Sequence, residues 1–467
     1  MVFSSLFFLY CFLPVCILLY FVSKKIAYRN FVLIVFSLIF YAWGEPVWVL
    51  LLIGSITLNY LQALVIDKFR DGFGSKLAMA TSLITNLGLL GIFKYSAFIT
   101  ENLNSFFSLN LHVPQLVLPI GISFYTFQNL SYIIDCYWGK VPVQKNYFKF
   151  LMYVSMFPQL VAGPIVRYSD ISKEIDARES TAEDISEGIL RVIIGLSKKV
   201  IIANNLSTIV DSFFGTDIST LSVTATWYTV ILYSLQVYFD FSGYSDMAIG
   251  LGRIFGFHFN ENFNYPFICK DVTEFWQRWH ISLGSFFRDY LLYLPIFGKR
   301  IQTLNLFIVW FATGLWHGAS WNFIIWGLYF GVFIFIERLI GKKRMKKIPL
   351  VIRHIVNKII IIVGFGIFYF ENLGELGIFF KNLVGFNGNA LFDDEVRISM
   401  LNNLFLIIVA ILCCFPICKL IGKAAEKSNK SIVLVNIGQS VIALAMLACS
   451  SILLVDATNN PFLYFRF

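Results

Sequence analysis

The chain has 467 residues, of which 58% are hydrophobic, 18% are aromatic and only 14% are charged, whereas a soluble globular protein carries roughly 25% charged residues. Apolar runs recur along the whole chain, so the composition excludes a water-soluble protein and predicts an all-α polytopic membrane protein. The formal net charge of +9 suits loops that face anionic lipid. The sequence offers no soluble basic face of the kind that nucleic-acid binding requires.

The apolar runs predict about nine to twelve membrane segments in one domain that covers residues 1–467. The first run lacks the basic leader and cleavage site of a signal peptide, so we expect a retained helix. Some runs are short and are expected to be re-entrant or tilted, whereas segment 304–338 is too long for one span and should break near its glycines. The candidate segments are 3–22, 31–44, 47–66, 77–93, 116–134, 150–166, 187–206, 223–250, 304–338, 355–370, 401–421 and 432–455.

The distribution of basic residues predicts the orientation of the chain in the membrane. Basic clusters follow the first, third and penultimate apolar runs, and the strongest is "GKKRMKK" at 341–347. Residues 371–400 are acidic instead. Because cytoplasmic loops carry an excess of Lys and Arg, this alternation predicts an N-terminus outside the cytoplasm. The threading of residues 95–300 stays open, because its segments mix apolar and polar residues.

Polar side chains interrupt an apolar run at 238–250, "YFDFSGYSDMAIG". The run contains Asp240, Ser242, Tyr244 and Asp246, and an ionised carboxylate at the bilayer centre costs at least ~2.5 kcal/mol. Two interpretations remain open. The four residues line a cavity that substrate enters, or they form a buried polar contact that locks two helices together.

Residues 271–295 predict one amphipathic helix. Trp276, His280, Leu283 and Phe287 share a face at helical spacing, and Glu274 with Arg278 forms an i, i+4 pair on another face. Such a helix lies at the membrane interface or lines a wet vestibule. Trp276 and Arg278 therefore either contact substrate or anchor the helix at the interface.

A histidine stands in the apolar stretch "FATGLWHGASWNF", 311–323. If 310–326 is helical, Thr313, His317 and Trp321 lie on one stripe, beside Trp316. Gly314 with Gly318, and Gly327 with Gly331, form small-xxx-small pairs that let a neighbouring helix approach closely.

His317 is either a satisfied core residue or a functional one, and its place inside a membrane segment favours function. An apolar setting lowers the pKa of an imidazole, so that it can accept a proton from an attacking hydroxyl. No histidine-rich motif or carboxylate cluster supports a metal site. The eight cysteines lie mostly in apolar segments without a C-x-x-C pair and are interpreted as buried thiols.

Several long motifs resemble the membrane-bound O-acyltransferases, in particular the alginate O-acetyltransferase-like branch that modifies bacterial extracellular polysaccharides. They lie in order over essentially the whole chain: "FYAWGEP" at 40–46, "LPIGISFYTFQNLSY" at 118–132, "YFDFSGYSDMAIGLGRIFGF" at 238–257, "FWQRWHISL" at 275–283, "GLWHGASWNFIIWG" at 314–327 and the terminal "NPFLYFRF".

The resemblance implies a many-helix fold around a central funnel, with His317 as general base near its narrow point and His280 as a second catalytic histidine. It implies that no cofactor is tightly bound and that the co-substrate is an acyl thioester, acetyl-CoA or an acylated carrier. The acceptor would be a hydroxyl of a polysaccharide or of an extracytoplasmic acetyltransferase-like partner protein, beyond the bacterial cytoplasmic membrane. Funnel-lining positions would be Asp240, Ser242, Tyr244, Asp246, Trp276, Arg278, Trp316 and Trp321.

The sequence departs from the branch at two places. The loop "LPIFGKR", 294–300, has one glycine where the branch usually has two, which puts a donor-binding role of this loop in doubt. Phe330 stands where the branch often has a histidine. Two other functions stay open: a teichoic acid D-alanyl transferase that uses an acyl-carrier protein and, from a different class, an acyl-lipid or glycan transporter, although no internal repeat supports the latter.

Overall fold

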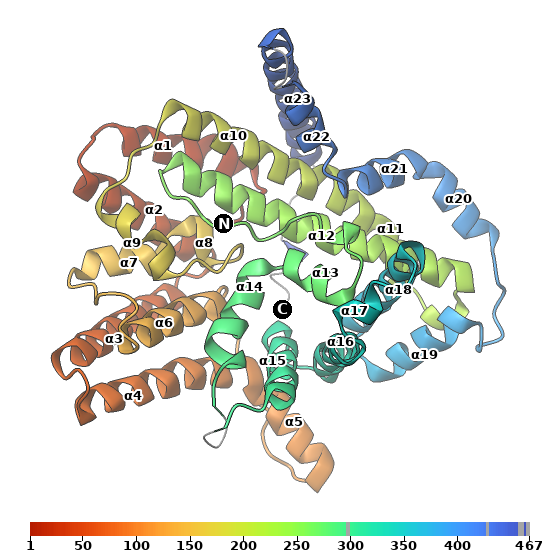
Figure 1. Ribbon diagram of the computed structural model, residues 1–467, viewed down its shortest axis with the longest axis horizontal. Coiled ribbons are helices and arrows are strands. Elements are labelled where there is room, and N and C mark those ends of the chain that lie inside the picture. Colours follow the sequence, from red (N-terminus) through yellow and green to blue (C-terminus); the bar gives the residue numbers. More distant parts are fainter. Residues whose placement is uncertain (296–298, 426–428, 456–461, 464–467) are drawn as a thin grey trace. The chain divides into compact units, whose positions relative to one another are not determined.

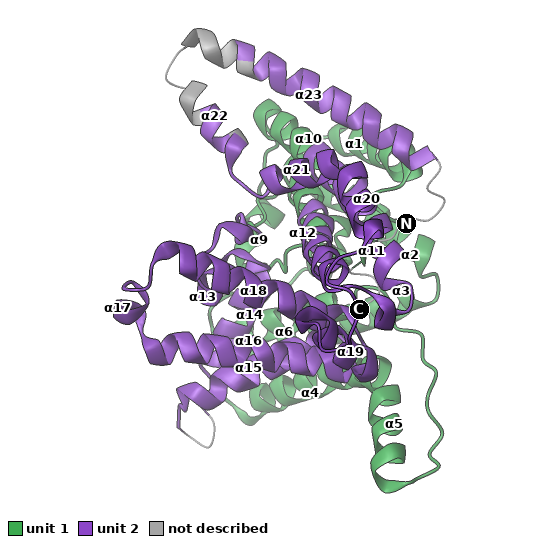
Figure 2. Ribbon diagram, turned by 90° about the vertical axis from the view of Figure 1, so that its right-hand side faces the viewer, with its two compact units in different colours: residues 1–192, 244–261, 459–465 green, residues 193–243, 262–458, 466–467 purple. Residues whose placement is uncertain are grey.

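The computed structural model describes residues 1–295, 299–425, 429–455 and 462–463. Within these ranges every regular element is a helix (Figure 1), which confirms the all-α prediction. The chain divides into two compact units that interleave in sequence (Figure 2). Unit 1 comprises residues 1–192, 244–261 and 459–465, and unit 2 comprises residues 193–243, 262–458 and 466–467. Two helices contain a unit boundary: α10 (Ala182–Ser197) and α12 (Val223–Ile254).

Unit 1 contains the N-terminal helices, together with a short π-helical turn before α1 and another after α4. Their bounds are η1 (Phe8–Phe12), α1 (Leu13–Phe21), α2 (Ile26–Gly44), α3 (Trp48–Lys68), α4 (Phe73–Leu90), η2 (Gly91–Tyr95), α5 (Ser96–Phe107), α6 (Ile122–Tyr137), α7 (Tyr147–Ser155), α8 (Phe157–Leu160) and α9 (Tyr168–Asp176).

Buried polar side chains connect α3, α4 and α6 inside unit 1. Asn59 Nδ2 donates to Asn86 Oδ1 at 3.2 Å, and Ser82 Oγ donates to Asn59 Oδ1 at 2.9 Å. Asn129 Nδ2 of α6 donates to Ser55 Oγ of α3 at 3.2 Å. Lipid tails are as apolar as the side chains, so burial of apolar groups does not by itself select which helices pair. Hydrogen bonds between helices help to make this selection, and each contributes roughly 0.6 kcal/mol on average.

Unit 2 contains the elements that carry most of the candidate residues. Their bounds are η3 (Lys198–Ala203), α11 (Asn204–Phe214), η4 (Ile218–Thr220), η5 (Pro266–Ile268), α13 (Val272–Arg278), α14 (Ile281–Phe287), η6 (Arg288–Leu292), α15 (Gln302–His317), α16 (Trp321–Ile340), α17 (Lys342–Met345), α18 (Leu350–Tyr369), α19 (Leu373–Val384), α20 (Asp394–Asn402), α21 (Leu404–Cys413), α22 (Ile417–Ala425) and α23 (Asn429–Val455).

The predicted count of nine to twelve membrane segments is not confirmed. In the described part of the chain, six helices are long and apolar enough to cross a membrane, or seven if the bent pair α20–α21 counts as one span. Residues 150–166 are an apolar run that is predicted as a membrane segment but forms no long helix. The run forms the short helices α7 and α8 and a non-helical end, and its side chains are buried inside unit 1. Burial within the protein and burial in lipid leave the same apolar signature in a sequence. The six spans are Ile26–Gly44, Trp48–Lys68, Phe73–Phe107, Trp321–Ile340, Leu350–Tyr369 and Asn436–Val455.

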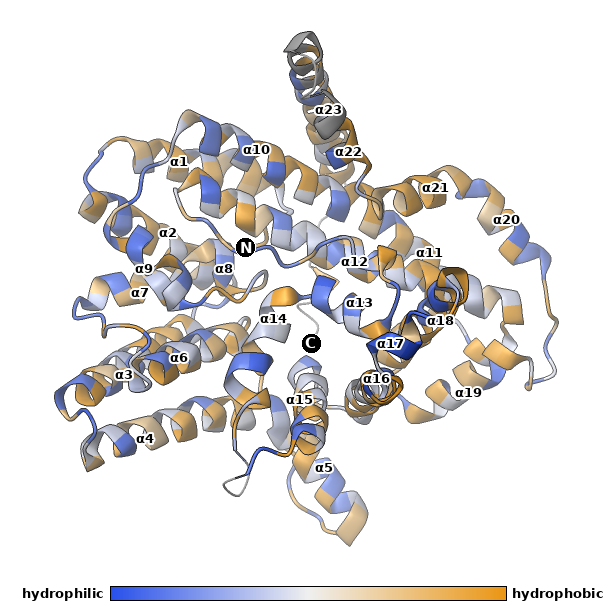
Figure 3. Ribbon diagram, in the orientation of Figure 1, coloured by the Kyte–Doolittle hydropathy of each residue, from blue (hydrophilic) through white to orange (hydrophobic). Residues whose placement is uncertain are grey.

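Hydropathy colouring shows the basic cluster at 341–347 as a hydrophilic turn. Figure 3 places the blue helix α17 between the largely apolar helices α16 and α18. Both flanking helices are candidate spans. This alternation is the pattern on which the predicted orientation rests.

The prediction of a single amphipathic helix over 271–295 is wrong. The chain forms α13, breaks at Trp279 and His280, and continues as α14 and the π-helical turn η6. Trp279 is extended and His280 has a left-handed backbone with φ +46°. Trp276 therefore lies on α13 and His280 in the break after it, so the two do not share one helix face. The expected i, i+4 pair is confirmed, because Arg278 Nη2 lies 2.9 Å from Glu274 Oε1.

Candidate active site

A tight helical hairpin carries His317. The prediction that segment 304–338 breaks near its glycines is confirmed, because α15 ends at His317 and α16 begins at Trp321. Gly314 faces the backbone of Phe323, and Gly327 faces the carbonyl of Trp310 so closely that a Cβ atom on either glycine would collide with the other helix. The small residues thus allow the two backbones to touch, as the spacing predicted.

Because of the turn of the hairpin, Trp321 does not lie where a continuous helix over 310–326 would place it. Gly318 has an extended backbone (φ −173°, ψ 160°) and stops the helix directly after His317. The stripe expected for a helix over 310–326 therefore does not extend to Trp321, which is the first residue of α16 and is 41% exposed. Thr313 keeps its place on the stripe and donates its hydroxyl to the carbonyl of Val309.

Aromatic rings surround His317. The imidazole is only 6% exposed and makes edge contacts with Trp326, 4.8 Å between ring centres, and with Phe368 of α18 at 5.2 Å. Trp316 packs against it at 4.9 Å. Near the same ring, Asn322 donates to the carbonyls of Ile367 and Phe368 and ties the start of α16 to the end of α18. The described contacts of this imidazole are thus made with aromatic rings.

His280 occupies the break between α13 and α14. Its Nδ1 lies 3.1 Å from Oδ1 of Asn262 and 3.4 Å from Oγ of Ser282. Phe241 of α12 contacts the ring at 4.7 Å. His280 is 2% exposed and lies outside the candidate spans, and burial lowers its pKa from 6.5 to about 3. The side chain is therefore a neutral imidazole at physiological pH.

Trp316 links the two histidines. Its ring centre is 5.5 Å from that of His280 and 4.9 Å from that of His317. The fold of unit 2 thus brings His280 together with Trp316 and His317, which the sequence singled out in two separate motifs. Their catalytic and substrate-binding roles remain predictions.

A second aromatic layer continues along the hairpin from His317. Trp276 of α13 contacts Trp310 at 4.9 Å, Trp326 at 5.4 Å and Phe330 at 4.9 Å. Phe330, which replaces the histidine frequent in the branch, is thus a buried core residue at 1% exposure. Among the described residues, the indole N–H groups of Trp276 and Trp326 have no hydrogen-bond partner. A buried donor without a partner costs about 1–3 kcal/mol and calls for an explanation.

Arg278 is engaged with its own neighbourhood. Its guanidinium bonds to Glu274 and also donates through Nη1 to the carbonyl of Asn264 at 3.1 Å. The side chain is about one quarter exposed. These bonds fix α13 to the loop before it and are compatible with either predicted role.

Asp240 forms a buried ion pair with Lys199. Lys199 Nζ lies 2.5 Å from Asp240 Oδ1, and both side chains are about 95% buried. In the same region, a Cβ atom on Gly243 of α12 would stand 2.7 Å from the carbonyl oxygen of Gly195, so the two backbones are in close contact. This geometry agrees with the interpretation that polar side chains of residues 238–250 form a buried contact that locks two helices together. Ser242 is buried on the same part of α12.

The other two residues of that segment belong to unit 1. Tyr244 stacks on Phe3 at 4.8 Å and contacts Phe462 at 4.7 Å. Asp246 pairs with Arg191 Nη2 at 2.8 Å, and the same guanidinium also binds Glu261. Tyr244 and Asp246 are therefore part of unit 1, whereas both candidate histidines belong to unit 2.

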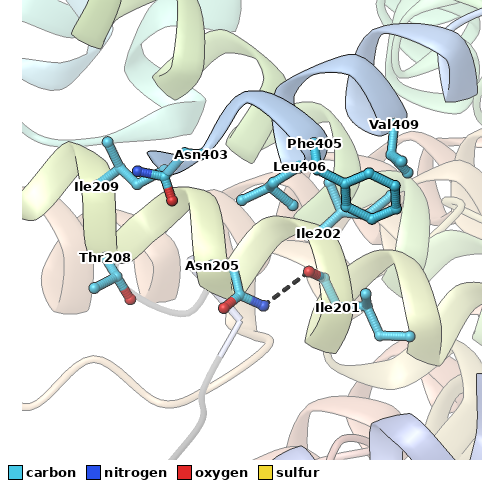
Figure 4. A pocket seen from close by; sticks show the side chains of 9 residues that line it. All are labelled: Ile201, Ile202, Asn205, Thr208, Ile209, Asn403, Phe405, Leu406 and Val409. Atoms are coloured by element: carbon cyan, nitrogen blue, oxygen red, sulfur yellow. Dashed lines mark hydrogen bonds between the residues drawn. The ribbon is translucent and has the colours of Figure 1, made fainter. Parts of the chain in front are cut away.

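An open groove in unit 2 involves none of the candidate residues. It has a volume of about 380 Å³ and lies between the η3–α11 segment and α21 (Figure 4). Figure 4 shows Asn205 of α11 bonded to the carbonyl of Ile201 in the preceding turn η3, rather than across the groove. The groove is lined by Ile201, Ile202, Asn205, Thr208, Ile209, Asn403, Phe405, Leu406 and Val409.

Two segments of the resemblance fall partly outside the described residues. Within the loop at 294–300, residues 296–298 are not described, so the structure does not address its donor-binding role. Within the terminal "NPFLYFRF", only residues 462–463 are described.

Sequence reasoning did not identify three residues of the candidate site. Trp326 lies inside a quoted motif, and its position on the second arm of the hairpin could have been found by folding 304–338 about its glycines. Phe368 comes from α18 and Asn262 from a loop, and each reaches a histidine only through the tertiary structure. No local pattern marks either position.

Comparisons with known proteins agree with the resemblance. A family model described as the membrane-bound O-acyltransferase family matches residues 141–373, a range that includes every candidate residue. The chain is 41% identical to the probable alginate O-acetylase of Pseudomonas aeruginosa over 80% of this chain and 73% of that protein. It is 34% identical to the peptidoglycan O-acetyltransferase of Helicobacter pylori, over 84% and 81% of the two chains. Identity to the teichoic acid D-alanyltransferase of Bacillus subtilis is 30%, over 51% and 64%.

Proposed function

Because the chain belongs to the membrane-bound O-acyltransferase family, we propose that it transfers an acetyl group from a cytoplasmic thioester to a hydroxyl of an extracytoplasmic polysaccharide. The receiving hydroxyl belongs to the polymer itself or to an exported partner protein that completes the transfer. The protein works as a multi-pass enzyme of the bacterial cytoplasmic membrane with its N-terminus outside. Relatives named for alginate and peptidoglycan acetylation support a glycan acceptor.

In the proposed reaction, His317 is the general base. Its imidazole accepts the proton of the acceptor hydroxyl while the oxygen attacks the thioester carbonyl. The tetrahedral intermediate then collapses, the C–S bond breaks, and the imidazolium returns the proton to the departing thiolate. The products are an acetyl ester and a free thiol. The observation that carries this proposal is the buried His317 ring enclosed by Trp316, Trp326 and Phe368, since a dry base remains neutral and excludes hydrolysis.

We assign the indole N–H of Trp326 to the thioester carbonyl. This donor is buried, has no partner among the described residues, and belongs to a ring in contact with His317. A hydrogen bond to the oxygen on which negative charge develops would stabilise the tetrahedral intermediate. It would also give the unsatisfied donor a partner.

D-Alanine transfer to teichoic acid is the second candidate function, and the Bacillus subtilis relative favours it. That similarity covers about half of this chain, whereas the similarity to the two O-acetylating relatives covers 80% or more. Acetyl transfer is therefore the function that we propose first.

Analysis of the acyl group released from the envelope tests the proposal. Polysaccharide is purified from the native host, from a strain that lacks the gene, and from the complemented strain, and mild alkali releases its esters. We expect ester-bound acetate to fall to background in the deletion strain and to return on complementation, with ester-bound D-alanine unchanged. Loss of D-alanine instead would support the second candidate, and loss of neither would contradict both.

A further inference from the structure

The side chain and the backbone of Asn262 hold residues 280–282 in an unusual conformation. His280 has φ +46°, a left-handed conformation that is uncommon for residues other than glycine. Asn262 accepts the N–H of Ile281 at its carbonyl, 3.0 Å away, and the N–H of Ser282 at Oδ1, 3.2 Å away. Asn262 is fully buried. The strained residue persists because these surrounding bonds fix it.

The same hydrogen bonds determine which nitrogen of His280 carries the proton. A backbone N–H can only donate, so the Asn262 atom that Ser282 N–H meets is the amide oxygen. The hydroxyl of Ser282 donates its one proton to this oxygen at 2.8 Å. Nδ1 of His280 lies 3.1 Å from the oxygen and 3.4 Å from the hydroxyl. Both of these atoms can only accept from Nδ1, so Nδ1 carries the hydrogen.

A neutral imidazole with its hydrogen on Nδ1 has a lone pair on Nε2. Phe241 and Trp316 hold the ring on two sides, and Trp316 is also in contact with His317. The lone pair therefore belongs to a fixed ring close to the proposed general base. It can accept a hydrogen bond but cannot donate one.

We propose that Asn262 is a positioning residue that fixes His280 in the Nδ1–H tautomer, so that Nε2 accepts a hydrogen bond from an O–H or N–H group of a bound substrate. This inference rests on the proposed function and deepens it. It excludes His280 as the proton donor to the leaving thiolate, since the neutral Nδ1–H tautomer has no proton on Nε2. The proton returned to the thiolate therefore comes from His317.

Nitrogen NMR of the histidine rings tests the tautomer directly. The chain has five histidines, so selective ¹⁵N labelling of imidazole in the purified protein yields few signals. The His280 signals are those lost in His280→Asn, a substitution that tolerates a left-handed backbone. At pH 7.5 we expect a protonated Nδ1 and an unprotonated Nε2. A proton on Nε2, or on both nitrogens, would overturn the inference.

Variants of Asn262 connect the tautomer to catalysis. Asn262→Asp keeps an oxygen acceptor for Nδ1–H and should keep the tautomer, whereas Asn262→Leu removes the acceptor and should mix the two tautomers. We expect Asn262→Leu to lower acetyl transfer about 10–100-fold, by analogy with the loss of residues that orient metal-binding histidines. The matched control is Asn264→Leu in the same loop, since Asn264 is exposed.

The outcomes separate this inference from the proposed function. If wild-type protein transfers acetyl groups while His280 carries its proton on Nε2, or while Asn262→Leu leaves both tautomer and rate unchanged, the inference fails alone. If wild-type protein transfers no acetyl group, the proposed function fails whatever the tautomer. Should Asn262→Leu not fold, the tautomer in the wild-type and Asn262→Asp proteins still decides the question.

Discussion

Replacing Lys199 by methionine should reveal what the buried pair with Asp240 does. The substitution leaves a carboxylate about 95% buried without the ammonium that lies 2.5 Å away in the wild-type protein. Removing one partner of a buried ion pair destabilises a protein by about 3–5 kcal/mol. Replacing both partners by apolar residues of similar volume is frequently neutral or stabilising. The expected order of stability is therefore Lys199→Met lowest, with Lys199→Met/Asp240→Leu close to the wild type.

Thermal unfolding in detergent, followed by tryptophan fluorescence, measures this difference. An unfolding entropy of about 2.1 cal/mol/K per residue over 467 residues converts each kcal/mol into about 1 °C of Tm. Helices that persist in detergent lower this entropy, so Lys199→Met should reduce Tm by at least about 3 °C. Lys198→Met, a partly exposed neighbour, is the control and should change Tm by less than about 0.5 °C, the small effect typical of surface substitutions.

The double variant also separates the two interpretations of Asp240. If the pair only locks α12 against η3, Lys199→Met/Asp240→Leu keeps most acetyl transfer together with its stability. If Asp240 contacts substrate, the double variant is stable and inactive. A wild-type Tm for Lys199→Met would refute the reasoning about the buried pair itself.

Three further predictions follow from the site and the fold. Trp326→Phe keeps an aromatic ring but removes the indole N–H, so kcat for acetyl transfer should fall about 10²-fold, as for loss of one oxyanion donor; an unchanged kcat would exclude this hydrogen bond. Burial lowers the pKa of His280 to about 3, below its value of about 6.5 in an unfolded chain, so protonation favours unfolding as the pH falls below 6.5. Between pH 7.5 and pH 5 the wild type should therefore lose about 2 kcal/mol more stability than His280→Asn in chemical denaturation, and equal losses would argue against burial of this ring. For the orientation, a cysteine at Lys343 should react with an impermeant maleimide only in inverted vesicles and one at Asp394 only in intact cells; the reverse pattern would place the N-terminus inside.

The sequence identified the hairpin and its histidine because both leave local signals. An ionisable residue in an apolar run is costly, and this cost alone singled out His317. Glycines at 314 and 327 indicated the close approach of two helices, and the glycines of 304–338, Gly318 among them, indicated where a segment of 35 residues could break. These properties depend on residue type and spacing, which a sequence displays directly.

Other features depend on contacts between residues far apart in the chain, and the sequence could not supply them. The pattern of Trp276, His280, Leu283 and Phe287 is compatible with one continuous helix, and the break at His280 results from hydrogen bonds to Asn262, 18 residues earlier. The partner of Asp240 is likewise 41 residues away. The predicted number of membrane segments is not confirmed for a related reason, since apolar runs such as 150–166 are buried by protein.

Acetyl transfer by a His317→Gln variant is the most direct test of the proposed mechanism. Glutamine retains a polar side chain of similar size but cannot act as a base near neutral pH. In the deletion strain complemented with equal amounts of folded protein, we expect ester-bound acetate at background for His317→Gln and at the wild-type level for His112→Gln, since His112 is exposed. Wild-type acetate from the His317→Gln strain would contradict the assignment of His317 as the base.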